Sequence, residues 1–394
     1  MMKINVGVFF GGSSVEHEVS IISAVQAMRY LDRDKYDVVP IYIAKTGDFY
    51  TDDSMLEIES FRDLPALLKR ACQVVVRKED SVAYLFRTKG GFGSKKPLTR
   101  IDIALPIVHG TNCEDGTLQG FLELLSIPYC GCDVMASSIG MDKELFKYAV
   151  ASKGIPALPC VCFYAKEWFS DQRSLSEKIA ENCGYPVIVK PANLGSSVGI
   201  KKVNTPQELP EAVEYACSFA EKILVEKAIC SLREINCSVL GDVSSARASV
   251  CEEPIMQDAI LSYEDKYMPG SSSKGMSSLK RKLPAEISAE KYQEIADYSV
   301  RAFRAIGACG VVRIDYLMDT ADNDCIYINE INTIPGSLAF YLWEASGVKY
   351  SQLLDELIEL GFKRARAKEK LSFSFETNIL SNAGFGSKGS KGKA

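Results

Sequence analysis

Two short stretches decide the fold of this chain: Val-Val-Arg-Ile-Asp-Tyr-Leu-Met at residues 311–318 and Ile-Tyr-Ile-Asn-Glu-Ile-Asn at residues 326–332. Both are rich in β-branched and aromatic residues, with polar side chains at intervals, as is typical of half-buried strands. The segment between them, residues 319–324, is polar and favours a turn. We therefore predict that the two strands pair as an antiparallel hairpin.

The hairpin carries polar side chains at alternating positions. Arg313 and Asp315 share one face of the first strand, and Glu330 and Asn332 share one face of the second. If both faces coincide, three oxygen ligands and a guanidinium converge, and such hard ligands suit Mg2+ held jointly with phosphate. A solvated face with ordinary charge pairs explains the same pattern. The Thr-Ile-Pro-Gly sequence at residues 333–336 favours the site, because it adds a rigid turn beside it.

A second cluster follows a strand-like stretch that ends at Lys190. Residues 193–199 read Asn-Leu-Gly-Ser-Ser-Val-Gly. A loop of such small residues can turn successive backbone N–H groups towards a phosphate, while the lysine adds a positive charge. The alternative is a β-hairpin with a flexible tip. Neither the P-loop motif nor the dinucleotide-binding glycine motif occurs in this loop.

The third cluster, residues 11–20, follows a buried strand and opens a helix. This is the usual place for a ligand site in an open α/β sheet. The cluster contains Glu16 and Glu18, but acidic residues near a helix N-terminus are also ordinary capping and dipole choices. We expect a capping role for Glu18, and leave Glu16 open between capping and ligand binding.

The chain has 394 residues, which is too many for one ordinary core and predicts two or three domains. In the first third, strands alternate with helices, which indicates an α/β domain with a parallel sheet. We expect strands at residues 4–10, 38–43 and 101–108 and a helix at residues 19–31. Residues 51–100 are polar and predict irregular structure, with a flexible segment at residues 89–97.

A change of composition near residues 131–138 suggests a domain boundary, after which a helix opens at Met141-Asp142-Lys143. The segment 263–283 is polar and predicts a loop. The tail is rich in Gly, Ser and Lys and is expected to be disordered. We expect strands at residues 186–190, 198–203, 223–226, 235–251 and 311–331, and helices at 288–307 and 349–366. The predicted domains are residues 1–133, 134–227 and 228–370, followed by the tail 371–394.

Composition excludes several classes of protein. A formal net charge of -5 argues against a general binder of nucleic acid or membrane surfaces. No apolar run approaches the roughly 20 residues needed to span a bilayer, and the apolar start lacks a signal-peptide cleavage site. The 13 cysteines are an odd number without metal-ligand spacing, so we expect reduced, mostly buried thiols. These features predict a cytoplasmic protein.

Seven motifs, in order along residues 4–360, resemble those of the D-alanine–D-alanine ligases. They are Gly11–Ser20, residues 109–120, Met141-Asp142-Lys143, residues 190–199, Tyr-Glu-Asp-Lys-Tyr at 263–267, Arg-Ile-Asp at 313–315, and residues 329–336. The resemblance implies an α/β chain, α+β in its C-terminal part, with the three-domain ATP-grasp fold. It also implies ATP-dependent ligation of D-alanine to a second D-amino acid for peptidoglycan precursor synthesis. Family members are often dimers, so a homodimer is a further expectation.

The resemblance also implies a role for each matching residue. ATP would contact Lys143, Lys190, Glu226 and Glu234, and two Mg2+ ions, or Mn2+, would bind Asp315, Glu330 and Asn332. Glu16 would bind the ammonium of the first amino acid, with His109 on the substrate side. Ser196 and Tyr267 would order a loop over the site together with Glu16, and Lys266 would reach phosphate and acceptor carboxylate. Arg313 and the Gly336 N–H would stabilise the oxyanion.

The sequence departs from the family pattern on the acceptor side. Tyr341 stands where the family has a serine that holds the acceptor carboxylate, and the segment 268–282 is unusually long and rich in Ser and Lys. D-Serine or another acceptor therefore remains an alternative to D-alanine. D-Lactate is less favoured, because relatives that use it generally replace the tyrosine found here at Tyr267. An alternative of another class is a non-catalytic nucleotide-binding protein, although binding alone would not require the whole set of charged residues.

Overall fold

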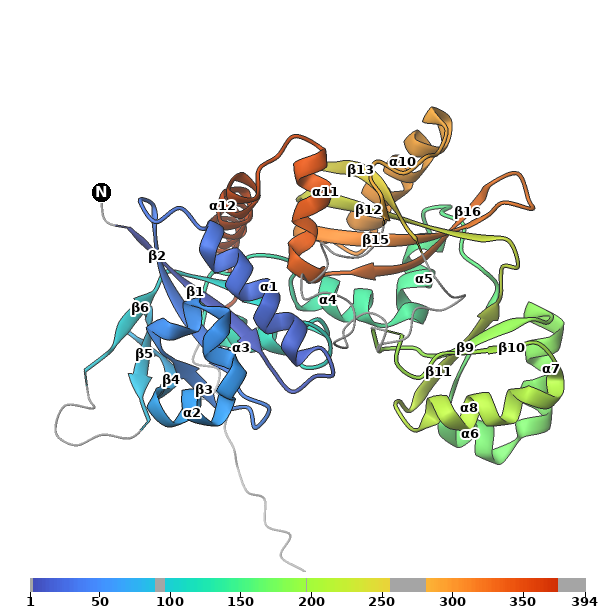
Figure 1. The fold of residues 1–394 in the computed structure, drawn as a ribbon, viewed down its shortest axis with the longest axis horizontal. Coiled ribbons are helices and arrows are strands. Elements are labelled where there is room, and N and C mark those ends of the chain that lie inside the picture. Colours follow the sequence, from blue (N-terminus) through green and yellow to red (C-terminus); the bar gives the residue numbers. More distant parts are fainter. Residues whose placement is uncertain (1–2, 89–95, 196, 256–280, 375–394) are drawn as a thin grey trace, which may run out of the picture.

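The computed structural model of the chain describes residues 3–88, 96–195, 197–255 and 281–374. Three β-sheets and the helices packed on them make up this part of the chain (Figure 1). The seven-stranded sheet near the N-terminus lies at one end of the molecule, the four-stranded sheet at the other, and the five-stranded sheet between them. Within the described residues, no helix is both long and apolar enough to cross a bilayer.

The N-terminal sheet is parallel at its centre and antiparallel beyond it. The central strand β1 (Ile4–Gly11) pairs in parallel with β2 (Tyr36–Ile43) and β7 (Ile103–Ile107), which confirms the expected parallel core. Antiparallel pairing then adds β3 (Phe49–Thr51), β4 (Cys72–Glu79), β5 (Val82–Arg87) and β6 (Thr99–Ile101). Helix α1 (His17–Tyr30) follows β1, close to its predicted bounds.

Our expectation of irregular structure at residues 51–100 is wrong. This segment holds β4, β5, β6 and helix α2 (Leu64–Arg70), and two short 3-10 helices precede α2. The turn between β4 and β5 consists of Asp80 and Ser81, both with positive φ, 48° and 68°. A two-residue turn of this kind matches the strand twist, but it usually contains glycine, which is why the hairpin was hard to predict. Residues 89–95 of the expected flexible segment lie outside the described residues.

The four-stranded sheet follows the order β10-β9-β11-β8 and is antiparallel throughout. Its strands are β8 (Cys160–Tyr164), β9 (Val187–Pro191), β10 (Lys201–Val203) and β11 (Lys222–Lys227). Three of them confirm predicted strands, although β10 is shorter than expected, and β8 is an addition. The helices α6 (Ala165–Ser170), α7 (Gln172–Cys183) and α8 (Leu209–Cys217) pack against this sheet.

The five-stranded sheet has the order β14-β13-β12-β15-β16 and carries the predicted hairpin. Its strands are β12 (Leu232–Gly241), β13 (Ala246–Pro254), β14 (Arg281–Lys282), β15 (Gly310–Asp319) and β16 (Cys325–Asn332). The antiparallel pairing of β15 with β16 confirms the hairpin. Helices α10 (Ala289–Ala305), α4 (Val134–Met141) and α5 (Lys143–Ala151) pack with this sheet around one apolar core.

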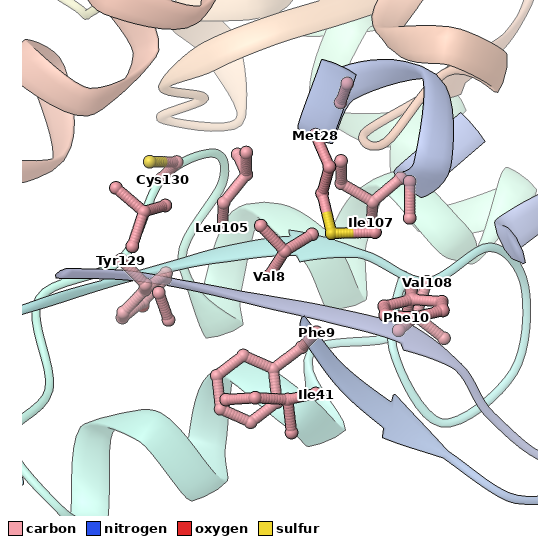
Figure 2. Packing of buried hydrophobic residues seen from close by; sticks show 14 of the residues in the cluster. Val8, Phe9, Phe10, Met28, Ile41, Leu105, Ile107, Val108, Tyr129 and Cys130 are labelled. Atoms are coloured by element: carbon pink, nitrogen blue, oxygen red, sulfur yellow. The ribbon is translucent and has the colours of Figure 1, made fainter. Parts of the chain in front are cut away.

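The largest core lies around β1, whose alternate side chains enter opposite faces of the sheet. In Figure 2, Val8 lies on the side of Met28 from α1 and Leu105 from β7, whereas Phe9 and Ile41 lie on the other side. All five are at most 1% exposed. Burial of each such side chain contributes roughly 1.5–3 kcal/mol, so this packing holds the end of β1, and the residues that follow it, in a fixed place.

Two C-terminal helices join the sheets. Helix α12 (Tyr350–Lys368) contributes Leu353, Leu354, Leu357 and Ile358 to the core around β1, although it follows the five-stranded sheet in sequence. Helix α11 (Phe340–Ala345) lies on β13 and against α12. Helix α3 (Thr117–Leu124) packs on the N-terminal sheet. Packed apolar side chains therefore hold the N-terminal sheet and the C-terminal helices together.

Candidate active site

A cavity of about 530 Å³ collects the residues predicted from the sequence. Its walls come from the four-stranded and five-stranded sheets, from α5, and from residues that follow β1 and β7 of the N-terminal sheet. Every predicted site residue that the structure describes lines this cavity: Glu16, His109, Lys143, Lys190, Glu226, Glu234, Arg313, Asp315, Glu330, Asn332 and Gly336. Ser196, Lys266 and Tyr267 lie outside the described residues. A cavity of this size and mixed polarity is typical of small-molecule sites.

The predicted convergence of the hairpin side chains is confirmed. Arg313 stands opposite Asn332, and Asp315 stands opposite Glu330, so all four side chains share one face. The Arg313 Nε and Nη2 atoms donate to the two oxygens of Asp315 at 2.7 Å each, and Asn332 Nδ2 donates to Asp315 Oδ2 at 3.1 Å. These charge-assisted hydrogen bonds are strong and fix the carboxylate in one orientation.

A bulge in β16 brings one more polar side chain to the cavity. The register with β15 shifts between Asp315 and Tyr316, which leaves Asn329 as the extra residue. Neighbouring residues of a regular strand face opposite ways, yet Asn329 and Glu330 both line the cavity. Asn329 Oδ1 accepts a hydrogen bond of 2.9 Å from Lys190. The bulge therefore connects the hairpin to the lysine of β9.

The donor atoms at the hairpin fit magnesium. Asp315, Glu330 and Asn332 offer only oxygen ligands, and each carboxylate oxygen has two lone pairs, so hydrogen bonds from Arg313 leave room for a cation. In the described part of the chain, no group of three or more His, Cys, Asp or Glu side chains has metal-binding geometry. Two carboxylates and an amide would therefore share the ion with phosphate and water oxygens, which is the usual arrangement for Mg2+.

Three buried charges cluster around Glu226 of β11, which contacts Lys190 of β9 and Lys147 of α5. Glu226 is 2% exposed and forms ion pairs with Lys190 and, at 2.9 Å, with Lys147. Burial alone would raise the pKa of Glu226, but the two lysines outweigh this effect and hold the pKa at about 2. For Lys190, burial dominates and lowers the pKa of the ammonium group. Glu226 therefore stays ionised and orients Lys190 along the cavity wall.

Lys143 connects the lysine-rich wall to the hairpin. Asp142 caps α5 by accepting hydrogen bonds from two backbone N–H groups, which places Lys143 in the first turn. The Lys143 Nζ atom lies 3.1 Å from Glu330 Oε2 and donates to the Leu194 carbonyl oxygen at 2.7 Å. Leu194 belongs to the small-residue loop that was predicted to bind phosphate. The predicted phosphate lysine, phosphate loop and metal carboxylate are thus in direct contact.

His109 and Glu16 line the cavity from the N-terminal part of the chain, where they follow β7 and β1. His109 Nδ1 donates to the Ile334 carbonyl oxygen at 2.8 Å, so Nε2 accepts from the Ser23 hydroxyl at 3.0 Å. Burial lowers the pKa of His109 even though the nearby Glu16 carboxylate opposes this shift. His109 is therefore neutral at physiological pH, with a tautomer set by its two partners. Glu18, by contrast, is an exposed residue in the first turn of α1, and it pairs with Lys45 at 3.0 Å.

Glu114 is a site residue that the sequence reasoning missed. It lies within the quoted motif at residues 109–120, but no role was assigned to it. Its two carboxyl oxygens accept hydrogen bonds from the N–H groups of Gly110 and Ile334, at 2.8 and 3.0 Å. Burial, reinforced by the charge of Glu16, raises the pKa of Glu114 to about 8. Only the position of Glu114 in the same motif as His109 could have indicated that it connects the backbone at Gly110 with that at Ile334.

Glu252, Asn236 and Arg281 also line the cavity and were not predicted. Asn236 of β12 stands opposite both Glu252 of β13 and Asp315 of β15, so one polar row crosses the sheet from Glu252 to Glu330. The position of Asn236 two residues after Glu234 could have indicated the shared face. The alignment of β12 with β15, and of β14 with β13, depends on pairing between distant segments, which the sequence does not reveal.

Tyr341 is the residue that departs from the family pattern, and it does not line the cavity. It follows Gly336 through three residues with positive φ, Ser337, Leu338 and Ala339, at 49°, 54° and 50°. Such a run is strained for residues with side chains, and the Ser337 N–H is held by the Ser23 hydroxyl at 3.0 Å. The turn directs the Tyr341 hydroxyl to Glu252, at 2.7 Å.

Comparison with known proteins places the chain in one family. Two family models match it: "D-ala D-ala ligase N-terminus" over residues 5–132 and "D-ala D-ala ligase C-terminus" over residues 149–359. The D-alanine–D-alanine ligase of Thermosipho melanesiensis is 38% identical over 381 residues, covering 96% of this chain and 98% of the relative. That of Geobacillus thermodenitrificans is 34% identical, covering 95% and 100%.

Solved structures agree with this grouping. The D-alanine-D-alanine ligase of Coxiella burnetii is 29% identical with a TM-score of 0.79, covering 94% of this chain and 97% of that structure. The VanG D-Ala:D-Ser ligase of Enterococcus faecalis is 31% identical with a TM-score of 0.76, covering 91% and 100%. Both fold and sequence match over nearly the whole length. The chain belongs to the D-alanine–D-alanine ligase family and has its ATP-grasp fold.

Proposed function

We propose that this protein joins D-alanine to a second D-amino acid, with D-alanine as the main acceptor, at the expense of ATP and through an acyl-phosphate intermediate. The product would serve the synthesis of peptidoglycan precursors. The carrying observation is that the hydrogen-bonded pair Arg313–Asp315 and the ion pair Glu330–Lys143 line a single cavity, with Asp315 and Glu330 directly opposite each other on neighbouring strands. A binding protein would not need a bidentate arginine beside a metal-type carboxylate pair.

The nucleotide would lie between the four-stranded and five-stranded sheets. Lys143 and Lys190 would hold the phosphates, Glu226 near the end of strand β11 would mark the adenine end, and Glu234 would contact the ribose. Two Mg2+ ions, with Mn2+ as an alternative, would bind Asp315, Glu330 and Asn332. Bound there, the ions would supply charge neutralisation for the transferring phosphoryl group.

The first amino acid would lie beside Glu16 and His109. Glu16 would accept its ammonium group, and neutral His109 would line its side without adding charge. The carboxylate would then point towards the lysines and become the acyl phosphate. The amine of the second amino acid attacks its carbonyl carbon, and Arg313 and the Gly336 N–H would stabilise the oxyanion before phosphate leaves.

Water must be kept from the acyl phosphate, because it hydrolyses readily. The family roles of Ser196, Lys266 and Tyr267 in ordering a loop over the site are part of this proposal. So are the domain limits at residues 133, 227 and 370, a cytoplasmic location and a homodimer.

D-Serine is a second candidate acceptor. The chain resembles a D-Ala:D-Ser ligase about as closely as it resembles the D-alanine-D-alanine ligases of known structure. Tyr341 also changes the acceptor side of the site.

The test is ADP release by the purified full chain with ATP, Mg2+ and D-alanine, followed by mass spectrometry of the product. We expect D-alanine-dependent ADP and a D-alanyl dipeptide. Addition of D-serine and other D-amino acids as competitors identifies the preferred acceptor. No D-alanine-dependent ADP above background would contradict the proposal and favour a nucleotide-binding protein without catalytic activity.

A further inference from the structure

A cluster of buried polar side chains lies at one end of the polar row that crosses the five-stranded sheet. Glu252 is 3% exposed and is the centre of this cluster. Its Oε1 atom accepts hydrogen bonds from Tyr341 at 2.7 Å and from Asn236 at 3.1 Å, and its Oε2 atom accepts from Arg281 Nη1 at 2.9 Å. The Arg281 guanidinium also lies over the Tyr341 ring, 4.1 Å from its centroid. Two contacts therefore hold Arg281 in one orientation.

The cluster is far from the phosphate end of the cavity. Glu252, Asn236, Asp315 and Glu330 are cross-strand neighbours on β13, β12, β15 and β16. Adjacent strands are about 4.8 Å apart, so Glu252 and Glu330 are separated by about 14 Å. Lys143 contacts Glu330 at the far end of the row. A phosphate held by Lys143 therefore does not reach Arg281.

Arg313 occupies the middle of this arrangement, on the strand between the two ends. The reacting carbonyl carbon must lie near Arg313, with the phosphoryl group towards Glu330. The attacking amino acid must then approach from the side of Glu252 and Arg281. A free amino acid carries a carboxylate, and a guanidinium with five N–H donors can bind a carboxylate by two parallel hydrogen bonds while it also holds Glu252.

Tyr341 cannot perform this role. Its hydroxyl is directed to Glu252 and not to the cavity. Burial raises the pKa of the Tyr341 phenol, so the group stays protonated and donates its hydrogen to the Glu252 carboxylate. Tyr341, which stands where the family has a serine, therefore lies beneath Arg281 and helps to position it.

We propose that Arg281 binds the carboxylate of the acceptor amino acid, and that Tyr341 and Glu252 position its guanidinium. This inference rests on the proposed ligase function and adds the residue that selects acceptors with a carboxylate. Arg281 is the specificity-determining residue, and Tyr341 and Glu252 are positioning residues.

D-Alaninamide tests the proposal, because it has an amine but no carboxylate and can act only as an acceptor. The full-length enzyme receives D-alanine and D-alaninamide together, and mass spectrometry gives the ratio of the two dipeptide products. Arg281→Met is expected to lower the use of D-alanine as acceptor by about 10- to 100-fold, the range for a lost hydrogen bond to a charged group. Its use of D-alaninamide should stay within about twofold of the wild-type value, since no carboxylate contact is lost.

Two further variants refine the test. Arg281→Lys keeps the charge but loses the planar fork, so it should recover part of the preference for the carboxylate. Tyr341→Phe keeps the ring beneath the guanidinium and removes the hydrogen bond to Glu252, so its preference should fall between those of wild type and Arg281→Met. Lys282→Met is the matched control: it removes a cation from the next residue of β14, whose ion pairs are with Glu253 and Glu286 outside the cavity.

The outcomes separate the inference from the proposed function. Equal losses with both acceptors in Arg281→Met, or no change with either, would overturn the role of Arg281 while D-alanine-dependent ADP release by the wild type still supports a ligase. A wild-type enzyme that releases no ADP with D-alanine would overturn the proposed function itself.

Discussion

Asp315 and Glu330 stand directly opposite each other on neighbouring strands, and each is held by a different cation. Two hydrogen bonds of 2.7 Å join Asp315 to Arg313, and an ion pair of 3.1 Å joins Glu330 to Lys143. The Asp315 partner lies on the same strand, whereas Lys143 lies on a helix that follows the N-terminal domain. The pair thus places the proposed metal ligands between the proposed phosphate lysine, Lys143, and the proposed oxyanion donor, Arg313.

Neutralising either carboxylate should stop catalysis and leave the fold intact. Asp315→Asn and Glu330→Gln keep the shape of each side chain but remove the charge that would hold the metal, so we expect turnover to fall at least about 100-fold. Steady-state ADP release measures this, and thermal unfolding checks the fold. Asp319→Asn, at the end of β15 and outside the cavity, is the control and should keep wild-type turnover. Wild-type rates in Asp315→Asn or Glu330→Gln would remove the metal-site hypothesis.

The pKa of Glu114 predicts a pH dependence of stability. In the unfolded chain the group has its ordinary pKa of 4.5, and in the folded protein the pKa is about 8, so the folded state binds more protons between these values. The free energy of unfolding that the proton on Glu114 adds is fully present below about pH 4.5 and is lost as the pH rises to about 8. Its size is on the order of a few kcal/mol.

Glu114→Gln removes this titration, so wild type should lose stability relative to the variant as the pH rises from 5 to 9. Denaturant unfolding at several pH values measures the difference. Glu59→Gln makes the same change on an exposed side chain and is the control. Its pH-dependent difference in stability from wild type is subtracted from that of Glu114→Gln. A difference between wild type and Glu114→Gln that does not change with pH would show that burial does not shift the pKa of Glu114.

Lys147 shares Glu226 with Lys190, and its removal should destabilise the protein. Lys147→Met leaves Glu226 with one cation instead of two. We expect a loss of about 2 kcal/mol, less than the ~3–5 kcal/mol of a fully broken buried pair, because Lys190 still neutralises the carboxylate. Lys153→Met, an exposed lysine just beyond α5, is the control. Equal stabilities of the two variants in urea unfolding would show that the second ion pair contributes nothing.

The sequence predicted most of the site, because the important side chains lie on short strands whose alternation is readable. Arg313 and Asp315 are two residues apart on β15, so their shared face followed from the strand geometry alone. The shared face of Asn236 and Asp315 depends on the register between β12 and β15, which pairing between distant segments determines. Glu252 joins this face across the turn from β12 to β13, in a register that is shifted between Cys237 and Val239. The bulge at Asn329 also exists only in the paired strands β15 and β16, so the sequence alone does not reveal it. The β4–β5 hairpin was missed because its turn contains Asp80 and Ser81 in place of glycine.

The close approach of Gly110 to Glu16 predicts a specific effect on the binding of the first amino acid. Gly110 has a φ of +76°, and a Cβ atom there would lie 2.4 Å from the Ser14 hydroxyl and 2.9 Å from Glu16 Oε2. Gly110→Ala would therefore both strain the backbone and push the Glu16 carboxylate from its place. We expect the KM for the first D-alanine to rise about tenfold or more, with a smaller effect on the KM for ATP.

Gly47 is the matched control, because its φ is +87° and a Cβ atom there would meet nothing within 4 Å. Gly47→Ala therefore carries the same backbone cost of roughly 1–2 kcal/mol without displacing a site residue. Steady-state kinetics of both variants, with D-alanine and ATP varied in turn, separate strain from displacement. If both alanine variants keep the wild-type KM for D-alanine, Glu16 does not hold the ammonium group of the first substrate. If Gly110→Ala and Gly47→Ala raise the KM for D-alanine equally, the cause is the backbone strain and not the contact with Glu16.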